Sequence, residues 1–444
     1  MESIAIVNCC LPPPPEKPLG APQAGLYLTS ALKNSKRETS IYDTAADFEP
    51  NTFTADALCA YLRRVPHRVI GLSIWDSVLP RVLCATRKLK EKEPERIIVF
   101  GGPSASSLNT KLLDLFPWID AVVVGEGEIT LDMLLTSIDS RRSNALDLPE
   151  KAFLRSNGRV LEGKRKIPTL SPRQIPIPDY SHINRSVYGR LELVTTRGCP
   201  LNCAYCSVNS ATGRLMRSRP MDHLFQEIAA LVKDEQDCIH VLDDNFTINA
   251  GRLHQFSSRF FAEFPKNTWS CYARLGDLDG ATTSMMIKSG CCGVFIGVES
   301  ADEVTLRSVG KISPNYNVLE RIKKISTQMN ITVSLIWGFP DEEVEALART
   351  LDFIKQLLDF DNIFVNLYQL APLSGTRLTH RMMKDLIFDE AAISGFVFPP
   401  SYPTLSDDEK KMIRRYPSVF SAFYHEGSKL FRMKHSLVQK FLGN

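Results

Sequence analysis

The stretch "TTRGCPLNCAYCSVNSATGR" places three cysteines within eight residues, with three residues between Cys199 and Cys203 and two between Cys203 and Cys206. A structural zinc site takes four protein ligands, and a conventional four-iron, four-sulfur (4Fe-4S) cluster is also held by four thiolates. No second cysteine pair is spaced to complete either site. Three thiolates on one loop therefore leave one iron of such a cluster without a protein ligand, and a substrate or cofactor can bind there.

The composition of the chain is that of an ordinary globular protein. It has 444 residues, of which 44% are hydrophobic and 23% charged, and this size favours two or three domains. Its 53 basic side chains nearly match its 50 acidic ones, which argues against a nucleic-acid partner. We find neither an apolar run of about 18 residues nor a basic segment ahead of an apolar one at the start. We therefore expect no membrane span, no secretory signal and a cytoplasmic location.

The chain has 11 cysteines, and their odd number and scattered spacing favour reduced thiols over disulfide bonds. Outside the loop they lie mostly in apolar segments, where a cysteine is usually a small buried hydrophobic residue. We predict this structural role for Cys9, Cys10, Cys59, Cys84, Cys238, Cys271, Cys291 and Cys292.

Short apolar runs alternate with helical patterns over residues 1–140. The runs that predict buried parallel strands are "SIAIVN" (3–8), "RVIGLSI" (68–74), "RIIVF" (96–100) and "DAVVVG" (120–125). This alternation predicts a doubly wound, flavodoxin-like or Rossmann-like α/β domain with a parallel sheet. Small residues follow the strands at Ser73, in "GGPSASS" from Gly101 and in "GEGE" at 125–128, at the sheet edge where such folds bind ligands.

A proline-rich segment over 141–189 predicts an extended linker, and a second alternation of strands and helices occupies 190–370. The strands expected there are 191–196, 238–243, 268–273, 293–298, 331–337 and 362–369. Six such units predict a partial (β/α)6 barrel of parallel strands. The cysteine loop follows the first of them, at the carboxyl end where barrels of this kind place their chemistry.

The last segment, 371–444, is aromatic and basic and predicts a small, mostly helical region. We expect its helices to pack over the barrel mouth and to contribute to a substrate region. The aromatic stretch "YPSVFSAFYH" (416–425) is either part of a substrate pocket or ordinary core.

The cysteine spacing CxxxCxxC after the first strand, the preceding "TTRGCP" and the aromatic Tyr205 resemble the radical S-adenosylmethionine superfamily. The resemblance covers about 189–370 and implies that Cys199, Cys203 and Cys206 bind a 4Fe-4S cluster whose open iron is chelated by S-adenosylmethionine. Family segments that recur in order are "LDDNFTIN" (242–249), "ARLGDLD" (273–279), "GCCGVFIGVES" (290–300) and "IWGFPDEEVEALARTLDF" (336–353). The resemblance implies that S-adenosylmethionine contacts Tyr205, Asp243, Asp244, Arg274, Gly297 and Glu299.

These residues also have ordinary structural interpretations. Asp243 and Asp244 are suited to capping the loop that follows them, and Glu299 or Arg274 to forming an ion pair. The order of the segments after the cysteine loop favours the functional interpretation.

The leading domain, the proline-rich linker and the barrel together resemble the cobalamin-binding branch of the superfamily, similar to its class B methyltransferases. The resemblance implies that the corrin ring contacts Ser73, Gly101, Gly102, Gly125 and Glu126. The DxHxxG pattern that supplies a histidine to cobalt in many such domains is absent, and His67 lies ahead of the third strand. We therefore expect no histidine ligand on the lower face of cobalt. The alternative is a degenerate domain that keeps the fold and binds no corrin.

The activity implied by the resemblance is radical C-methylation of an unactivated carbon, with a 5'-deoxyadenosyl radical and methylcobalamin. A second possibility is radical rearrangement, cyclisation or oxidation without methyl transfer. A third, of another class, is a non-catalytic iron-sulfur or zinc-binding module. The expected partners are a small-molecule or peptide substrate and an electron donor such as flavodoxin or ferredoxin.

Overall fold

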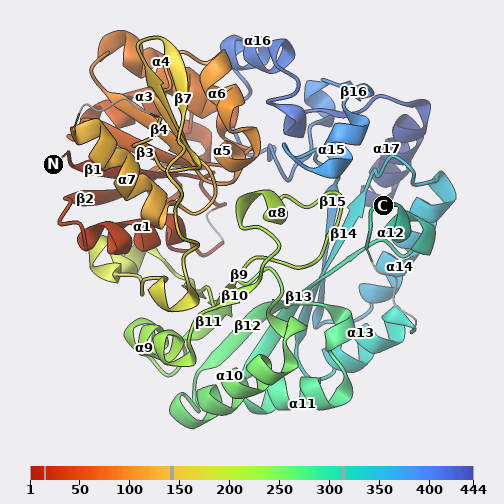
Figure 1. Cartoon of the computed structure of the whole chain (residues 1–444). Coiled ribbons are helices and arrows are strands. Elements are labelled where there is room, and N and C mark those ends of the chain that lie inside the picture. Colours follow the sequence, from red (N-terminus) through yellow and green to blue (C-terminus); the bar gives the residue numbers. More distant parts are fainter. Residues whose placement is uncertain (1, 15–16, 141–144, 312–315, 444) are drawn as a thin grey trace.

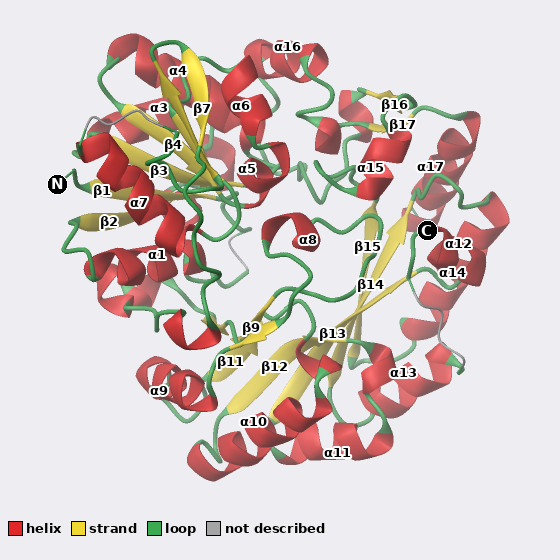
Figure 2. Cartoon of the chain, in the orientation of Figure 1, coloured by secondary structure: helices red, strands yellow, loops and turns green. Residues whose placement is uncertain are grey.

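The computed structural model describes residues 2–14, 17–140, 145–311 and 316–443, so the first four residues of the predicted linker lie outside the described residues. Two large, separate sheets and the helices packed on them make up most of the chain (Figures 1 and 2). The first belongs to the leading domain and the second to the barrel.

The first sheet has the strand order β2-β1-β3-β4-β5-β6-β7. Its first five strands are parallel, whereas β6 and β7 are antiparallel. The strands are β1 (Ile4–Cys9), β2 (Thr39–Asp43), β3 (Val69–Ile74), β4 (Ile97–Gly101), β5 (Ala121–Val123), β6 (Ala152–Ser156) and β7 (Arg159–Glu162). The four apolar runs predicted as strands are thus confirmed as β1, β3, β4 and β5.

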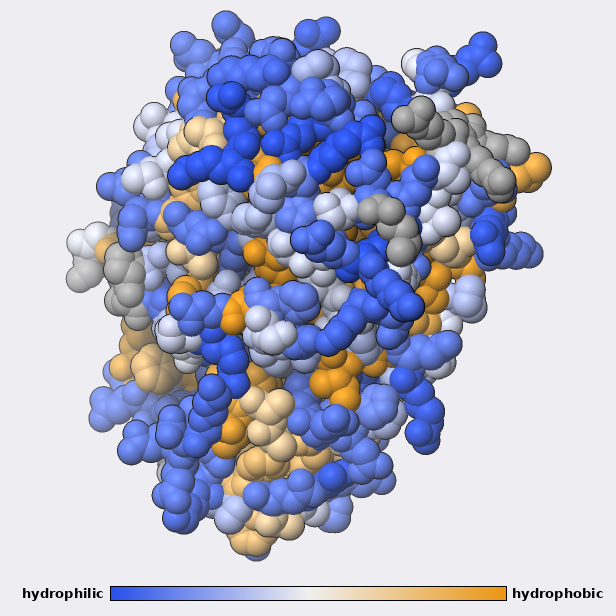
Figure 3. Space-filling model, turned by 90° about the vertical axis from the view of Figure 1, so that its left-hand side faces the viewer, coloured by the Kyte–Doolittle hydropathy of each residue, from blue (hydrophilic) through white to orange (hydrophobic). Residues whose placement is uncertain are grey.

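Helices cover both faces of this sheet, which confirms the doubly wound α/β fold. Helices α1 and α7 contact each other over one face, and α3 and α4 contact each other over the opposite face. The helices of this domain are α1 (Gln23–Lys33), α2 (Thr44–Asp47), α3 (Ala55–Arg64), α4 (Leu79–Lys92), α5 (Pro103–Leu108), α6 (Thr110–Leu115) and α7 (Gly127–Asp139). The outer face of this side of the molecule is mostly hydrophilic with smaller hydrophobic patches (Figure 3), because the helices turn their apolar sides to the sheet.

Strands β6 and β7 lie in the segment predicted as a linker. They form a hairpin that continues the first sheet beyond β5, so the prediction of an extended linker is wrong for Ala152–Glu162. The division of the chain at residue 140 stays a prediction, as do the other domain limits.

The second sheet is an open, all-parallel barrel of six strands in the order β15-β14-β13-β12-β11-β8. Its strands are β8 (Leu191–Leu193), β11 (Cys238–Val241), β12 (Thr268–Ala273), β13 (Cys291–Glu299), β14 (Asn330–Trp337) and β15 (Ile363–Gln369). The helices are α9 (Met221–Leu231), α10 (Ala250–Glu263), α11 (Gly280–Lys288), α12 (Glu303–Ser308), α13 (Val318–Ser326) and α14 (Val344–Leu357). A second hydrophobic core fills the space between these strands and helices, and the partial barrel is confirmed.

The C-terminal segment connects the two units. It contains α15 (Arg377–Met382), β16 (Leu386–Ile387), α16 (Asp407–Arg415), β17 (His425–Glu426) and α17 (Lys429–Leu442). Helix α16 packs on α4 of the leading domain and α17 packs on α14 of the barrel, so the prediction that the helices cover the barrel mouth is wrong for these two. Helix α15 does lie there, because Leu378 and Met382 pack with Ala204 and Tyr205 of the cysteine loop. The aromatic stretch 416–425 is core, because Val419, Phe420, Phe423 and Tyr424 are buried in the hydrophobic cluster of the leading domain.

No helix within the described ranges has the length and apolar character needed to cross a membrane.

A buried ion pair fixes α16 to the leading domain. The Arg81 guanidinium lies 2.9 Å from the Glu409 carboxylate, and both side chains are at most 5% exposed. We expect Glu409→Ala to lower the free energy of unfolding by about 3–5 kcal/mol, because it leaves Arg81 buried without its partner. Asp408→Ala, which breaks the exposed Arg87–Asp408 pair beside it, should cost about 1 kcal/mol or less. Urea unfolding of both variants tests this, and equal losses would contradict it.

Candidate active site between the two domains

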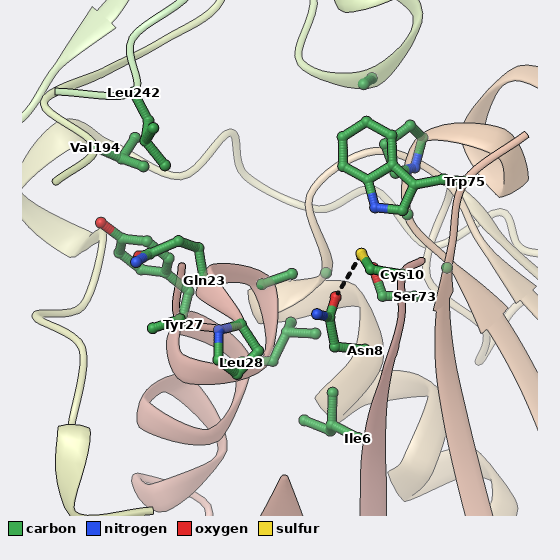
Figure 4. Close-up of a pocket in the computed structure, with 18 of the residues that line it drawn as sticks. Ile6, Asn8, Cys10, Gln23, Tyr27, Leu28, Ser73, Trp75, Val194 and Leu242 are labelled. Atoms are coloured by element: carbon green, nitrogen blue, oxygen red, sulfur yellow. Dashed lines mark hydrogen bonds between the residues drawn. The ribbon is translucent and has the colours of Figure 1, made fainter. Parts of the chain in front are cut away.

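The carboxyl ends of the two sheets face one cavity of about 670 Å³. The leading domain lines it with Asn8 and Cys10 at the end of β1 and with Ser73 and Trp75 at the end of β3, and the barrel contributes Val194, Thr196, Arg197, Leu242 and Asp244. Figure 4 shows Val194 and Leu242 on the barrel side, across from Trp75, Ser73 and Cys10. A cavity bounded by two domains is a common position for a ligand or active site.

All five residues predicted to contact the corrin ring line this cavity: Ser73, Gly101, Gly102, Gly125 and Glu126. Gly102 has a φ of +89°, and a Cβ atom there would lie 2.8 Å from the Ile74 nitrogen, so only glycine fits the β4–α5 turn. The turns thus present backbone with little side-chain bulk, which lets a flat ligand approach closely.

The Glu126 carboxylate has a second role that the sequence did not reveal. It forms ion pairs with Arg197, at 3.0 Å, and with Arg217, at 2.6 Å. Burial raises its pKa, but these two arginines outweigh burial and hold the pKa below its usual value. Arg197 also pairs with Glu128 and lies over the Tyr27 ring, so one cluster of charges joins the two domains.

The cysteine loop lies between these two arginines. Strand β9 (Thr196–Arg197) pairs with β10 (Arg217–Ser218) and closes the loop at its base. Gly198 makes the turn into the loop with a φ of +90°. Only glycine fits there, because a Cβ atom would lie 2.4 Å from the Leu215 carbonyl oxygen. The short helix α8 (Val208–Ala211) follows the third cysteine and packs on α5 of the leading domain.

The three thiols of the loop are unpaired and half-buried. Burial raises the pKa of Cys199, and Asp244 and Cys203 raise it further. Burial also raises the pKa of Cys206 to about 11, with added effects of Cys203, Asp244 and Cys199. Thiols with raised pKa values near a carboxylate need a positive charge to ionise, and iron supplies one on binding. This donor set therefore fits a 4Fe-4S cluster. No group of three His, Cys, Asp or Glu residues in the described ranges is arranged to hold a metal ion by itself.

Tyr205, Gly297 and Glu299 come together as predicted. The Tyr205 hydroxyl donates to Glu299 Oε1 at 3.1 Å, and Lys311 Nζ donates to the same oxygen at 2.7 Å. Lys311 also donates to the Gly297 carbonyl oxygen at 2.7 Å. Glu299 has a φ of +66° and is buried, a strained backbone of the kind that clusters at functional sites. Sequence reasoning missed Lys311.

The two adjacent aspartates have different surroundings. Asp243 is buried and accepts hydrogen bonds from the backbone N–H and the hydroxyl of both Thr195 and Thr196, so it fixes the chain just ahead of the cysteine loop. Asp244 is exposed to the cavity, where partial desolvation and the neighbouring Asp243 raise its pKa to about 6. Arg274 is half-buried near Cys199, and its charge offsets a small part of the increase that burial causes in the pKa of that thiol. Asp243 therefore has a structural role, as the alternative interpretation expected. It restrains Thr195 and Thr196 ahead of the cysteine loop and not the loop that follows Asp243.

Sequence reasoning also missed Tyr27, Arg197, Trp75 and Cys10, which line the same cavity. Arg197 lies directly before the cysteine motif, so its position was a usable signal. The other three have no pattern in the sequence that distinguishes them from core residues.

Comparisons with known proteins agree with this geometry. Residues 193–354 match the radical SAM superfamily, and residues 19–135 match the B12 binding domain family. An uncharacterized methyltransferase of Pyrococcus horikoshii is 27% identical over 80% of this chain and 77% of its own length. The anaerobic magnesium-protoporphyrin IX monomethyl ester cyclase of a Synechocystis strain is 28% identical over 76% of this chain and 68% of its own.

Two solved structures share the fold. The radical S-adenosylmethionine methyltransferase TsrM from Kitasatospora setae, with cobalamin and a 4Fe-4S cluster bound, has a TM-score of 0.65 and is 17% identical, over 86% of this chain and 78% of that chain. The cobalamin-dependent enzyme OxsB, with aqua-cobalamin and S-adenosylmethionine bound, has a TM-score of 0.70 and is 14% identical, over 100% and 67% of the two chains. With both matching domains on one cavity, the chain belongs to the radical S-adenosylmethionine superfamily, in the branch that carries a B12 binding domain.

Proposed function

We propose that the protein is a cobalamin-dependent radical S-adenosylmethionine enzyme that methylates an unactivated carbon of a small-molecule or peptide substrate. The observation that carries this proposal is that the cysteine loop and the glycine turns of the B12 binding domain approach a single cavity. The relatedness to a methyltransferase of Pyrococcus horikoshii supports the choice of methyl transfer.

We assign the cluster to Cys199, Cys203 and Cys206, and S-adenosylmethionine to Tyr205, Asp244, Arg274, Gly297 and Glu299. Asp243 acts by holding Thr195 and Thr196 in place. Glu299 is fixed by Tyr205 and Lys311 and is therefore preorganised to accept hydrogen bonds from ribose hydroxyls. When bound, the cluster, S-adenosylmethionine and cobalamin supply an electron, a 5'-deoxyadenosyl radical and a methyl group, respectively.

We assign the corrin ring to the surface formed by Ser73, Gly101, Gly102 and Gly125. Glu126 borders this surface and is paired with Arg197 and Arg217, so its contribution is to align the corrin side of the cavity with the cysteine loop. The two domains line the cavity from opposite sides, which limits the directions from which water can reach a reactive radical.

We further propose a cytoplasmic location and an electron donor of the flavodoxin or ferredoxin type. All 11 cysteines are free thiols, which is typical of a reducing compartment.

The choice of cluster ligands is tested with two cysteine variants. Cys203→Ala should abolish the visible absorbance of the anaerobically reconstituted cluster, because two thiolates on this loop cannot hold three irons. Cys238→Ala should leave that absorbance unchanged, because Cys238 begins β11 at the opposite end of the barrel. A full cluster in the first variant, or its loss in the second, would mean that other thiolates bind the iron.

Binding of the corrin is tested at Gly101. A Cβ atom there would have only the Val123 carbonyl oxygen within 4.0 Å, so Gly101→Leu should fold normally and project into the cavity. We expect it to weaken hydroxocobalamin binding at least tenfold in equilibrium dialysis. The matched control Gly280→Leu lies at the start of α11, in open space, and should bind as the wild type does. Unchanged binding by Gly101→Leu would mean that the corrin does not contact this turn, and absence of binding by the wild type would support the degenerate domain.

Methyl transfer is tested by product mass. The reconstituted enzyme is incubated anaerobically with dithionite, a metabolite extract and S-adenosylmethionine carrying a deuterated methyl group. We expect 5'-deoxyadenosine and a product that carries one labelled methyl group in place of hydrogen, neither of which should form with Cys203→Ala. A changed product without the label would favour rearrangement, cyclisation or oxidation, and absence of both products would favour a binding module.

A further inference from the structure

Two cysteines meet at the end of the barrel opposite the cluster loop. Cys238 is the first residue of β11, and Cys292 is the second residue of β13. Their Sγ atoms lie 3.6 Å apart, and both side chains are half-buried. The residues assigned to cofactors lie at the other ends of the same strands, where Asp244 follows β11 and Glu299 ends β13.

An irregularity in strand pairing brings these thiols together. Trp269 of β12 pairs with Cys291, but Ser270 pairs with Gly293, so Cys292 is an extra residue in β13. Such a bulge redirects the side chain of the extra residue. Cys292 Sγ thereby lies 3.4 Å from the Trp269 carbonyl oxygen and reaches across β12 to Cys238 on β11.

The contact makes the two thiols chemically unequal. A hydrogen bond from Cys238 lowers the pKa of Cys292 to about 6, and the same interaction raises the pKa of Cys238 well above its usual value. Of the two thiols, Cys292 is therefore the one that ionises more readily, and a second thiol lies beside it. Low-pKa, partly exposed cysteines next to a second cysteine are the ones that react with disulfides and oxidants.

A nearby pair shows the contrast. Cys271 and Cys291 are both buried in the barrel core, and burial raises the pKa of Cys291. Buried thiols of this kind are unreactive. The difference between the two pairs follows from which side of the sheet each cysteine faces.

We propose that Cys238 and Cys292 form a redox-active dithiol, a site of reversible modification by low-molecular-weight disulfides such as oxidised glutathione. The Cys292 thiolate attacks one sulfur of glutathione disulfide and releases one glutathione thiolate, which leaves a mixed disulfide on Cys292. Cys238 then loses its proton and attacks the Cys292 sulfur, which releases the second glutathione. The protein gains one disulfide bond and loses two hydrogens, and glutathione disulfide is reduced to two thiols.

The bond requires the sulfur atoms to move from 3.6 Å to about 2.05 Å, and because β12 lies between the two strands, the ends of β11 and β13 must move toward each other as it forms. Once formed, it cross-links the two strands that carry Asp244 and Glu299 at their other ends. The proposal is independent of the proposed function, because thiol exchange does not require substrate, S-adenosylmethionine or cobalamin.

The test is peptide mapping of the full-length, cluster-reconstituted protein after anaerobic incubation with oxidised glutathione and alkylation with N-ethylmaleimide. We expect a Cys238–Cys292 cross-linked peptide, while the visible absorbance of the cluster stays unchanged. Cys238→Ser should instead accumulate a glutathione adduct on Cys292, because the resolving thiol is missing. Cys271→Ala, the matched control, should form the same cross-link as the wild type.

Alkylation of both Cys238 and Cys292 by N-ethylmaleimide in the treated wild type would overturn the proposal. So would a cross-link of Cys292 to any other cysteine, or an equal yield of glutathione adduct on Cys271 and Cys292. Loss of cluster absorbance together with the cross-link would also contradict it, since the pair would then be exchanging with the cluster ligands.

Discussion

The ion pairs of Glu126 with Arg197 and Arg217 are the constraint on which the rest of the site depends. The carboxylate belongs to the turn after the last parallel strand of the leading domain, and the two arginines form the base of the cysteine loop. These groups are mostly shielded from solvent, so their attraction is stronger than that of exposed pairs. The loop is therefore positioned against the B12 binding domain as well as against its own barrel.

This constraint explains why the B12 binding domain and the radical S-adenosylmethionine domain line one cavity. Each parallel sheet presents its carboxyl ends to ligands, and the ion pairs turn those ends toward each other. Asp243 adds a second restraint by holding Thr195 and Thr196, the residues directly before Arg197. Asp244, the glycine turns and the residues Arg197, Ala211 and Thr212, which flank the three cysteines, then border the same cavity. The cysteine-loop side and the B12 binding domain side of the proposed site are thus held close together.

Much of the fold could be predicted, because strands buried on both faces are continuous apolar runs. Strand β2, "TSIYD", was missed since it lies at the sheet edge and mixes polar and apolar residues. The hairpin β6–β7 was read as linker because its pairing with β5 comes from tertiary contacts that no local pattern encodes. Helices α16 and α17 were predicted as helices but misplaced, since amphipathicity shows that a helix has a buried side and does not show which partner covers it.

In the candidate site, too, local sequence patterns predicted some features, and others depend on tertiary contacts. The cysteine spacing predicted the cluster loop, and the short glycine-rich turns predicted the corrin side, because both chemistries demand those residues locally; the glycine turns do line the cavity. The partners of Glu126 and Glu299 could not be foreseen: Arg197 is 71 residues away from the first, and Lys311 is 12 residues beyond the second. The approach of Cys238 to Cys292 was equally hidden, because it depends on a single extra residue in β13.

The central claim is that the cluster and cobalamin share the cavity held together by Glu126. The most direct measurement is electron paramagnetic resonance of the full-length protein that contains both the reduced cluster and cob(II)alamin, compared with samples that contain each centre alone. We predict a spin–spin interaction that splits or broadens both signals, and a weaker one in Glu126→Gln. A spectrum equal to the sum of the two separate signals would contradict the account.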